Sequence, residues 1–467
     1  MQITFHGAAR VVTGSKHLIT LASGRKLLLD CGMFQGGDEE TGKLNQNLGF
    51  DASTVDWMVL SHAHIDHCGL IPKLVREGFK GPIYCTPATL DLVRILLLDS
   101  AEIQESDARY MNKKVRALGL PIQEPLYGEQ DVKKALPLFR TLGYGEPLEI
   151  SPEIRLTYSD VGHIIGAAAV NLQITEGGKQ TAVTFSGDVG RYNDIILKSP
   201  EPFPQADFIL LESTYGNSLH EVSGPMDAEL LRYIQHTCLE KKGKLIIPAF
   251  SVGRTQELLY QLNGMSLKGT LPDLDIFVDS PLSEEATEVV KKHPECFNST
   301  VGALLRTDAD PFSFPRLKYA KDVSQSKAIN NHPDPCVIIS ASGMADAGRV
   351  KHHIANNISD PRNTILIVGY CEPRSLGGRL GEGARKVTIY GTHYEVQAEV
   401  GKIRSMSAHG DYRDLIRFLG CQDLSRIRTL FLVHGEYPVQ QDFRQRLLQT
   451  GLKKVEIPAI HESWPLV

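Results

Sequence analysis

Three histidines and an aspartate lie within six positions of this chain: His62, His64, Asp66 and His67. They directly follow the apolar run 57–60, so they begin a loop at the end of an expected strand. In an extended backbone His62 and His64 point the same way and can chelate one ion, while Asp66 and His67 reach toward a second. Nitrogen ligands with an oxygen ligand suit zinc, although related transition metals compete for such a set. We therefore predict a two-metal site rather than a polar loop whose histidines only form hydrogen bonds.

The first two hundred residues alternate short apolar runs with turn signals. Strands are expected at 25–30, 55–60, 82–85 and 182–185, and polar or glycine residues follow each of them. A helix is expected over 90–114, which has helical periodicity. Functional residues at strand ends are typical of a layered α/β scaffold.

A second α/β pattern begins near Gly216. Its apolar runs are nearly continuous and are separated by helical segments, which implies a parallel sheet covered on both faces. We expect its strands at 244–248, 275–279, 336–340 and 364–368, and a capped helix start over 251–260. The last eighty residues return to short strands that carry histidines, ending in a strand over 429–434 and a helix over 439–449.

The composition excludes several classes of protein. A chain of 467 residues should form two or three domains, and 42% hydrophobic with 22% charged residues is an ordinary soluble composition. The net charge of −5 argues against a broadly basic surface, but a metal-lined cleft can still bind phosphate locally. We see no signal peptide, no membrane-spanning stretch and no C-x-x-C pair among the eight cysteines. The chain is therefore expected to be cytoplasmic, with reduced thiols and no membrane partner.

Three more residues fit the same chemistry. Asp30 follows an expected strand, His163 lies in Gly-His-Ile-Ile-Gly, and Asp188 lies in Ser-Gly-Asp. Taken alone, His163 is equally a structural histidine and Asp188 an ordinary turn aspartate. In chain order with the histidine cluster, however, these residues resemble the metallo-β-lactamase superfamily, whose fold is an αββα sandwich with a two-metal site at its edge.

Three further segments narrow the resemblance to the β-CASP group. Segment 211–216, Leu-Glu-Ser-Thr-Tyr-Gly, is similar to motif A of that group, 405–412 to motif B, and 432–436, Leu-Val-His-Gly-Glu, to motif C. The resemblance extends from Gly7 to about Gln449. It implies an α/β protein: an αββα metallo-β-lactamase sandwich with an inserted α/β β-CASP domain built on a parallel sheet.

The implied domains are a first metallo-β-lactamase part at 1–216, the inserted β-CASP domain at 217–385, and the C-terminal metallo-β-lactamase part at 386–467. The resemblance also implies two groups of metal ligands with one shared carboxylate: His62, His64 and His163 for one zinc, Asp66, His67 and His434 for the other, and Asp188 bridging both. A carboxylate can bridge because it has two oxygens. Two zinc ions per chain are expected, with Mn²⁺ as a substitute, and such a pair favours in-line phosphoryl displacement.

Roles for the remaining polar residues also come from the resemblance. Asp30 should orient ligand histidines through hydrogen bonds. Glu212 should do the same for His409 and favour its protonated form, so that His409 is the general acid. Asp66 is counted among the catalytic residues as well as the ligands. Read without the resemblance, Glu212 is a carboxylate at a helix N-terminus and His409 a surface-loop histidine.

The inserted domain is expected to cap the metal edge and bind a single strand. Hydroxyls, backbone amides and arginines near its strand ends and helix starts are plausible phosphate contacts, although turn-forming roles are an equal alternative. The candidate RNA-binding residues are Ser251, Arg254, Ser340, Ser342, Gly343 and Arg379. Segment 369–380 resembles a family segment but has Cys371 where glutamine is common and Ser375 where threonine is common.

The preferred function is therefore a zinc-dependent ribonuclease that acts on single-stranded RNA and leaves 5′-phosphate and 3′-hydroxyl ends. Within the group, a histidine at motif C is associated with RNA enzymes and a valine with DNA enzymes, so His434 favours RNA. The alternatives are a single-strand DNA or dual-specificity nuclease and, less favoured, a non-catalytic scaffold of an RNA-processing complex. The sequence leaves open whether the chain is a monomer or a homodimer, and how endo- and 5′–3′ exonucleolytic cleavage are balanced.

Overall fold

The computed structural model describes residues 1–36, 39–117, 122, 124–220, 226–369, 371–403 and 407–466. The chain forms two compact units, which we call unit 1 (Met1–Leu219 with His409–Val467) and unit 2 (His220–Ala408). Tyr370 and the motif B residues Ser405 and Met406 lie outside the described residues.

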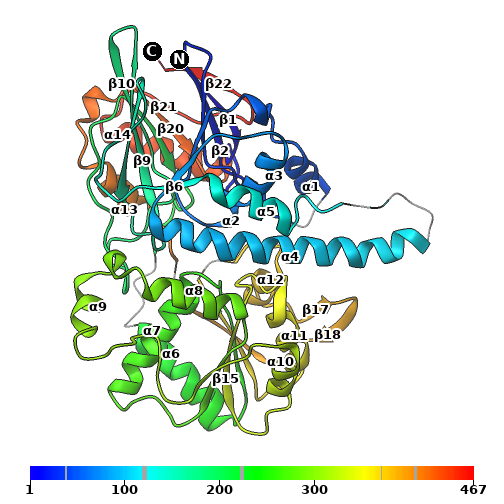
Figure 1. Cartoon of the computed structure of the whole chain (residues 1–467). Coiled ribbons are helices and arrows are strands. Elements are labelled where there is room, and N and C mark those ends of the chain that lie inside the picture. Colours follow the sequence, from blue (N-terminus) through cyan, green and yellow to red (C-terminus); the bar gives the residue numbers. More distant parts are fainter. Residues whose placement is uncertain are drawn as a thin grey trace. The chain divides into compact units, whose positions relative to one another are not determined.

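Unit 1 contains two seven-stranded sheets (Figure 1). The first has the order β22-β1-β2-β3-β4-β5-β6, with bounds β1 (Gln2–Gly7), β2 (Lys16–Thr20), β3 (Lys26–Leu29), β4 (Trp57–Val59), β5 (Ile83–Cys85), β6 (Phe139–Thr141) and β22 (Ser463–Pro465). The second has the order β21-β20-β11-β10-β9-β8-β7, with bounds β7 (Leu148–Ser151), β8 (Ile154–Asp160), β9 (Ala168–Glu176), β10 (Lys179–Phe185), β11 (Phe208–Glu212), β20 (Thr429–Val433) and β21 (Val455–Glu456).

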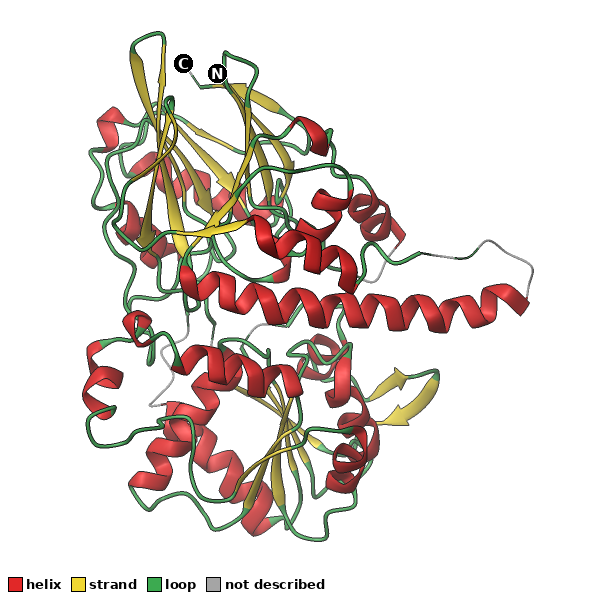
Figure 2. Ribbon diagram, in the orientation of Figure 1, coloured by secondary structure: helices red, strands yellow, loops and turns green. Residues whose placement is uncertain are grey.

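The two sheets of unit 1 share one apolar core. Alternate residues of several strands, such as Leu27 and Leu29 of β3, belong to it because side chains alternate between the faces of a sheet. Phe5 of β1 meets Phe431 of β20 across the layer, with ring centroids 5.3 Å apart. Helices lie outside both sheets (Figures 1 and 2), which completes an αββα sandwich. They are α1 (Glu39–Gln46), α2 (Ile65–Cys68), α3 (Ile71–Arg76), α4 (Pro87–Ala117), α5 (Glu129–Ala135), α13 (Tyr412–Leu419) and α14 (Tyr437–Gln449), with short 3₁₀ turns at Ala52–Thr54, Leu136–Leu138 and Leu424–Arg426.

Unit 2 is built on a six-stranded sheet of order β14-β13-β15-β12-β16-β19, in which every pair of neighbouring strands is parallel. Its strands are β12 (Leu245–Pro248), β13 (Asp275–Val278), β14 (Leu317–Tyr319), β15 (Cys336–Ser340), β16 (Thr364–Val368) and β19 (Glu399–Ile403), beside a hairpin of β17 (Lys386–Ile389) and β18 (Thr392–Glu395). Its helices are α6 (Met226–Ile234), α7 (Arg254–Leu267), α8 (Pro281–Lys291), α9 (Ser299–Leu304), α10 (Val323–Asn330), α11 (Gly348–Asn357) and α12 (Leu376–Gly381), with a π-helical turn at Gln235–Glu240 and a 3₁₀ turn at Pro294–Cys296. The expected fold class, a sandwich with an α/β unit built on a parallel sheet, is confirmed.

Two local features differ from the sequence-based expectation. The chain passes from unit 1 to unit 2 after residue 219 and returns to unit 1 after residue 408. The return lies further along the chain than the expected boundary at 385/386, because β19 pairs with β16 of unit 2. Helix α7 begins at Arg254 rather than Ser251, since Gly253 has a φ of 82° that is incompatible with a helix. Across the described residues, we find no helix long and apolar enough to cross a membrane.

Candidate metal centre

The candidate ligands of unit 1 come together because the strands that carry them end at one edge. β10, β11 and β20 are parallel neighbours in the second sheet, and β3 and β4 are parallel neighbours in the first. Parallel strands present their carboxyl ends on the same side. The residues that follow these ends, or close the loop between β8 and β9, are Asp30, His62, His64, Asp66, His67, His163, Asp188 and His434.

Sharp backbone turns bring these side chains inward. Asp30 and His434 adopt left-handed conformations, with φ of 57° and 53°, which residues other than glycine rarely do and which recur at functional sites. Gly187, before Asp188, has a φ of 55°, and a Cβ there would lie 2.8 Å from the Cβ of Ser61. Glycine is therefore required where the loop carrying Asp188 crosses the histidine loop.

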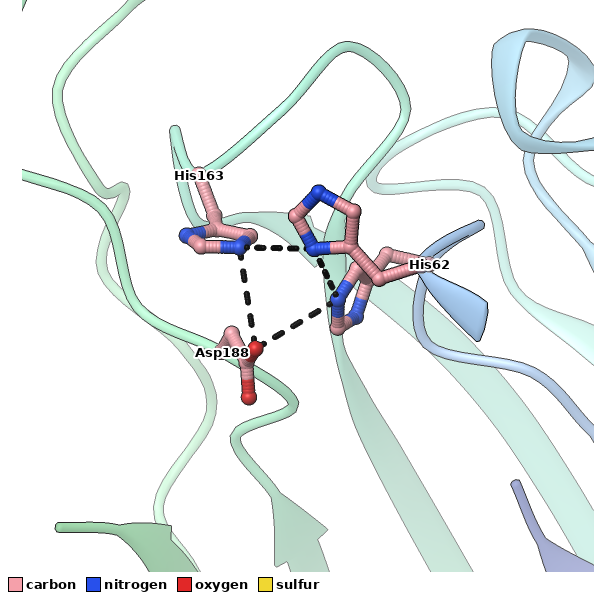
Figure 3. Close-up of side chains that lie close together, drawn as sticks. His62, His163 and Asp188 are labelled. Atoms are coloured by element: carbon pink, nitrogen blue, oxygen red, sulfur yellow. Dashed lines mark hydrogen bonds and ion pairs between the residues drawn. The ribbon is translucent and has the colours of Figure 1, made fainter. Parts of the chain in front are cut away.

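The first group of ligands is His62, His64, His163 and Asp188, whose donor atoms all lie within 4.8 Å of one another (Figure 3). Asp188 Oδ2 is 3.5 Å from His62 Nε2 and 3.6 Å from His163 Nε2. His64 Nδ1 lies 3.2 Å from each of those two nitrogens. Three imidazole nitrogens and one carboxylate oxygen thus converge on one point.

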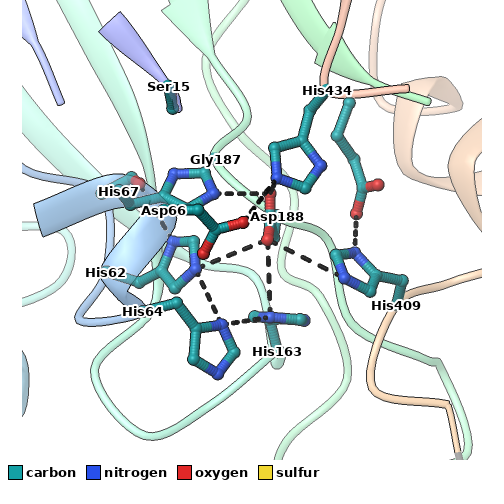
Figure 4. Close-up of polar contacts among 12 residues, drawn as sticks. Ser15, His62, His64, Asp66, His67, His163, Gly187, Asp188, His409 and His434 are labelled. Atoms are coloured by element: carbon teal, nitrogen blue, oxygen red, sulfur yellow. Dashed lines mark hydrogen bonds and ion pairs between the residues drawn. The ribbon is translucent and has the colours of Figure 1, made fainter. Parts of the chain in front are cut away.

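The second group is Asp66, His67 and His434, and it faces the other oxygen of the same aspartate (Figure 4). Asp188 Oδ1 is 3.3 Å from His67 Nε2 and 3.6 Å from His434 Nε2. Asp66 Oδ2 is 3.4 Å from His434 Nε2. Asp188 therefore lies between the two groups and offers one oxygen to each.

Hydrogen bonding within the protein leaves this cluster unsatisfied. Among the described residues, neither Asp188 Oδ1 nor His67 Nε2 has a hydrogen-bond partner, and their 3.3 Å approach lacks hydrogen-bond geometry. Both residues are buried. Burying polar groups without partners is unfavourable, and bound cations would satisfy them. The donor set of nitrogens and carboxylate oxygens therefore fits a pair of divalent metals such as zinc.

The pKa shifts differ between the two groups of ligands. Burial lowers the pKa of His62 and His163 well below its usual value and that of His64 to about 4, so these imidazoles are neutral, as ligands must be. Burial raises the pKa of Asp66, but the hydrogen bond with His434 and the charge of His67 bring it down to about 2. Burial also lowers the pKa of His67, yet the carboxylates of Asp188 and Asp30 raise it well above its usual value. His67 therefore carries a proton that a bound metal would displace.

Outer hydrogen bonds orient the ligands. Asp30 Oδ2 is 2.7 Å from His67 Nδ1, which leaves Nε2 directed toward Asp188. Asp30 also accepts hydrogen bonds from the Ser61 backbone N at 2.8 Å, from Ser61 Oγ at 2.9 Å and from Ser15 Oγ at 3.1 Å. Thr214 Oγ1 lies 3.0 Å from His434 Nδ1.

Ser15, Ser61 and Thr214 were not among the site residues predicted from the sequence. Two of them had a visible signal: Ser61 directly precedes the first ligand, and Thr214 lies inside the motif A segment. Ser15 had none, because its contact with Asp30 depends on the folding of the loop before β2.

His409 lies beside the cluster and contacts Glu212. His409 Nδ1 is 3.0 Å from Glu212 Oε1, and the backbone N of Val189 donates to the same oxygen at 2.7 Å. His409 Nε2 is 3.9 Å from Asp188 Oδ2. Burial lowers the pKa of His409, but the charges of Glu212 and Asp188 raise it to about 9.

A second role is also geometrically open to His409, because Asp188, His409 and His434 bring ligand atoms within 4.8 Å of one another. The His409 side chain is 20% exposed, however, whereas the ring of His163 is fully buried and that of His434 is 3% exposed. Its longer distance from Asp188 and its access to solvent favour a residue that exchanges protons over a further ligand.

In unit 2 the candidate phosphate contacts differ in availability. Ser340 is buried and its Oγ donates to the backbone oxygen of Asp279 at 2.7 Å. Arg254 is also buried and forms an ion pair with Glu257. Ser251 Oγ lies 3.4 Å from Ser280 Oγ.

The other three candidates are placed differently. Ser342 is half-buried, Gly343 follows it with no room for a Cβ against the ring of Phe250, and Arg379 is exposed. Ser342 and Gly343 follow the carboxyl end of β15, and Arg379 lies in the short helix α12. Arg254 and Ser340 are thus engaged within the fold, whereas the side chains of Ser342 and Arg379 are at least partly exposed.

Comparison with known proteins identifies the class. Residues 12–219 match the metallo-beta-lactamase superfamily, 255–380 the Beta-Casp domain, and 393–458 the Zn-dependent metallo-hydrolase RNA specificity domain. The chain belongs to the β-CASP group of the metallo-β-lactamase superfamily, and it is a metal-dependent hydrolase.

Its relatives include proteins whose names refer to RNA cleavage or to transcription. Ribonuclease TTHA0252 of Thermus thermophilus is 36% identical over 93% of this chain and 93% of its own length. Transcription termination factor FttA of Methanosarcina mazei is 31% identical over 93% of this chain and 67% of its own length. An RNase J-like protein of Methanocaldococcus jannaschii is 29% identical over 96% of each chain. The alignment with the solved Rm3 metallo-β-lactamase covers 37% of this chain and 55% of that one, at 23% identity and a TM-score of 0.23.

Proposed function

We propose that this protein is a two-zinc ribonuclease that hydrolyses phosphodiester bonds of single-stranded RNA and leaves 5′-phosphate and 3′-hydroxyl ends. The observation that carries the proposal is Asp188, whose two oxygens face two separate groups of buried ligands. RNA as the substrate is supported by the relative named as a ribonuclease and by the match to an RNA specificity domain. Such a substrate suits a cytoplasmic enzyme. We propose internal cleavage as the main mode, with 5′–3′ trimming as a second.

Two zinc ions would be held by the groups around Asp188, and Mn²⁺ suits the same nitrogen and oxygen donors. When bound, such a pair supplies Lewis-acid polarisation of a phosphoryl oxygen and a water of lowered pKa. Asp30 fixes the ring of His67 so that Nε2 is the ligand atom, and Thr214 does the same for His434.

His409 supplies the proton for the departing oxygen. In the protonated ring, Nδ1–H donates to Glu212 and the second proton is carried by Nε2, which lies 3.9 Å from Asp188 Oδ2. That proton passes to the 3′-oxygen as its bond to phosphorus breaks, and Glu212 stabilises the imidazolium beforehand. Asp66 acts through the oxygen that does not face His434, by accepting a hydrogen bond from the attacking water. Ser342, Gly343 and Arg379 are proposed to bind phosphates of the strand.

End-labelled RNA and DNA of matched sequence test the proposal, with both product ends mapped. RNA should be cut and DNA spared, and a 2′-O-methyl group at the cleaved position should leave the position of cleavage and the ends unchanged, because the 2′-hydroxyl is not the nucleophile. Equal cleavage of DNA would favour the dual-specificity alternative, and absence of cleavage with full metal content would favour the scaffold. A 2′,3′-cyclic phosphate as first product, or undiminished activity after metal removal, would overturn the mechanism.

A further inference from the structure

The hairpin of β17 and β18 in unit 2 carries an exposed tyrosine at its turn. The hairpin projects beside α11 (Figure 1). Tyr390 and Gly391 connect its two strands, with φ of 52° and 80°. Such turns favour asparagine and glycine, because bulky side chains rarely adopt a positive φ. Tyr390 is 56% exposed, so burial in the core does not explain a large ring there. Residues held in this conformation recur at functional sites.

Tyr390 contacts two residues of helix α11. Its ring is stacked on that of His352, with ring centroids 4.6 Å apart and an interplanar angle of 25°. The Nζ of Lys351 lies 4.9 Å from the centroid of the Tyr390 ring. His352 is exposed as well, so a third flat ring can extend the stack. A nucleotide offers such a ring together with a phosphate for the nearby ammonium group.

The elements around this stack are basic. Helices α10 and α11 contain no acidic residue, and the acidic residue of the hairpin, Glu395, pairs with Lys386 at 3.0 Å. Arg349 of α11 pairs with the buried Asp279. This part of unit 2 therefore differs from the chain as a whole, whose net charge is −5.

Two lysines near the stack keep their charge available. Lys327 of α10 is exposed, and Lys351 Nζ donates to the backbone oxygen of Asp346 at 3.2 Å. In the described part of the chain, neither lysine has a carboxylate partner. Burial and the charges of His353, Lys351 and Lys327 lower the pKa of His352. Both lysines thus lie close enough to His352 to act on it electrostatically.

The stack also lies close to the proposed phosphate contacts of unit 2. The backbone N of Ser342 donates to the backbone oxygen of Ala347 at 3.3 Å, and α11 begins at Gly348. His352 is four residues further along α11, about 6 Å at 1.5 Å per residue. A strand bound at Ser342 can therefore continue toward the stack.

We propose that Tyr390 and His352, together with Lys327 and Lys351, form a platform for single-stranded RNA. One base stacks on the rings while the lysines bind neighbouring phosphates, an arrangement that holds single strands without reading their sequence. A duplex is disfavoured, because its bases already stack on one another. The platform rests on RNA as the proposed substrate and extends the strand contact beyond Ser342. An acidic protein segment would use the lysines but not the rings.

Binding of short single strands to the full chain tests the role of the ring. The measurements use a His409→Ala background to slow cleavage, and compare an RNA strand with an abasic strand of the same length. Tyr390→Ala should weaken binding of RNA at least about fivefold and leave the abasic strand unchanged, because only base stacking is lost. Tyr390→Phe keeps the ring and should bind both strands like the background protein.

Salt dependence tests the role of the lysines. Lys327→Ala/Lys351→Ala should weaken both strands equally, and should reduce the slope of log affinity against log salt by about 1.4, since each phosphate contact in a single strand contributes about 0.7. Lys268→Ala is the matched control: this exposed lysine of unit 2 pairs with Asp227, so its loss should leave binding unchanged.

Three results would overturn the platform: RNA affinity unchanged in Tyr390→Ala, equal weakening of RNA and abasic strand by Tyr390→Ala, or an unchanged salt slope in the double lysine variant. Loss of RNA affinity in Tyr390→Phe would also contradict it. Because these readouts are affinities, RNA that binds through the platform but is never cleaved by the wild type would refute the ribonuclease and not the platform. Normal cleavage of RNA without the expected changes in affinity would refute the platform alone.

Discussion

In each unit, polar residues cluster at the carboxyl edge of a sheet, but the two clusters differ in how far hydrogen bonds within the protein satisfy their buried carboxylate. In unit 2 the buried carboxylate of Asp279 accepts hydrogen bonds from Arg349 Nη1 at 2.7 Å, Ser326 Oγ at 2.5 Å and His353 Nε2 at 2.6 Å. Burial raises the pKa of Asp279, but these donors hold it below its usual value. The carboxylate of Asp279 is therefore satisfied by hydrogen bonds within unit 2.

The carboxylate of Asp188 in unit 1 is as deeply buried but is surrounded by imidazole nitrogens at 3.3 to 3.9 Å. Within the described residues its Oδ1 has no hydrogen-bond partner. The comparison shows how a buried polar network that holds a fold differs from one that binds a cation. The first is closed by hydrogen bonds, and the second leaves donor atoms converging without them.

The largest expected effect is that of Asp188→Ala. Since one carboxylate faces both groups of ligands, the variant should lose metal from both sites and nearly all hydrolytic activity. Metal content by mass spectrometry of the folded protein is the measurement. His434→Ala is the internal comparison and should mainly empty one site. Full metal content in Asp188→Ala would remove the bridging role.

His409→Ala should lower turnover by about 10²–10⁴-fold, the usual contribution of a general acid, while metal content stays close to that of the wild type. Glu212→Gln should have a smaller effect, because the imidazole remains but is less well held. Single-turnover rates and metal content are measured on the same preparations. Loss of one metal from His409→Ala would instead make this residue a ligand, the second role that its distance from Asp188 and His434 leaves open.

Asp279→Ala should destabilise the protein by about 3–5 kcal/mol, because it leaves Arg349 and His353 without their buried counter-charge. Denaturant unfolding measures the change, and metal content should be unaffected. Metal loss from folded Asp279→Ala, or an unchanged free energy of unfolding, would contradict the distinction drawn between the two edges.

Asp160 allows a test by pH. This carboxyl is buried at the end of β8, and burial raises its pKa to about 7 although the backbone N of Gly162 donates to it. Because its pKa is higher in the folded protein, the Asp160 carboxyl loses its proton at a lower pH in the unfolded chain than in the folded one. The free energy of unfolding of the wild type should therefore fall as pH rises from about 4 to 7. The loss relative to Asp160→Asn should reach up to about 4 kcal/mol. Parallel stability profiles of the two proteins between these pH values would show that Asp160 is not the cause.

Local sequence patterns were sufficient to predict many of the strands, one long helix and the candidate ligands of this protein. The apolar runs predicted β3, β4, β5, β10, β12, β13, β15, β16 and β20, and the periodicity over 90–114 predicted most of α4, because these elements depend on the pattern of a few neighbouring residues. The candidate ligands were also visible, since four of them occupy six positions and the others lie in short motifs.

Only the tertiary structure decided the contacts that join distant segments. Thr214 meets His434 across 220 positions, and Ser15 meets Asp30, because strand register and loop folding bring them together. Pairing of β19 with β16 decided that the chain stays in unit 2 up to residue 408. Ser340 and Arg254 are also buried, the first in a hydrogen bond and the second in an ion pair within unit 2, which residue type alone could not show. Residue types and spacing can predict which atoms suit a metal or a phosphate, whereas packing determines which of those atoms remain free to bind one.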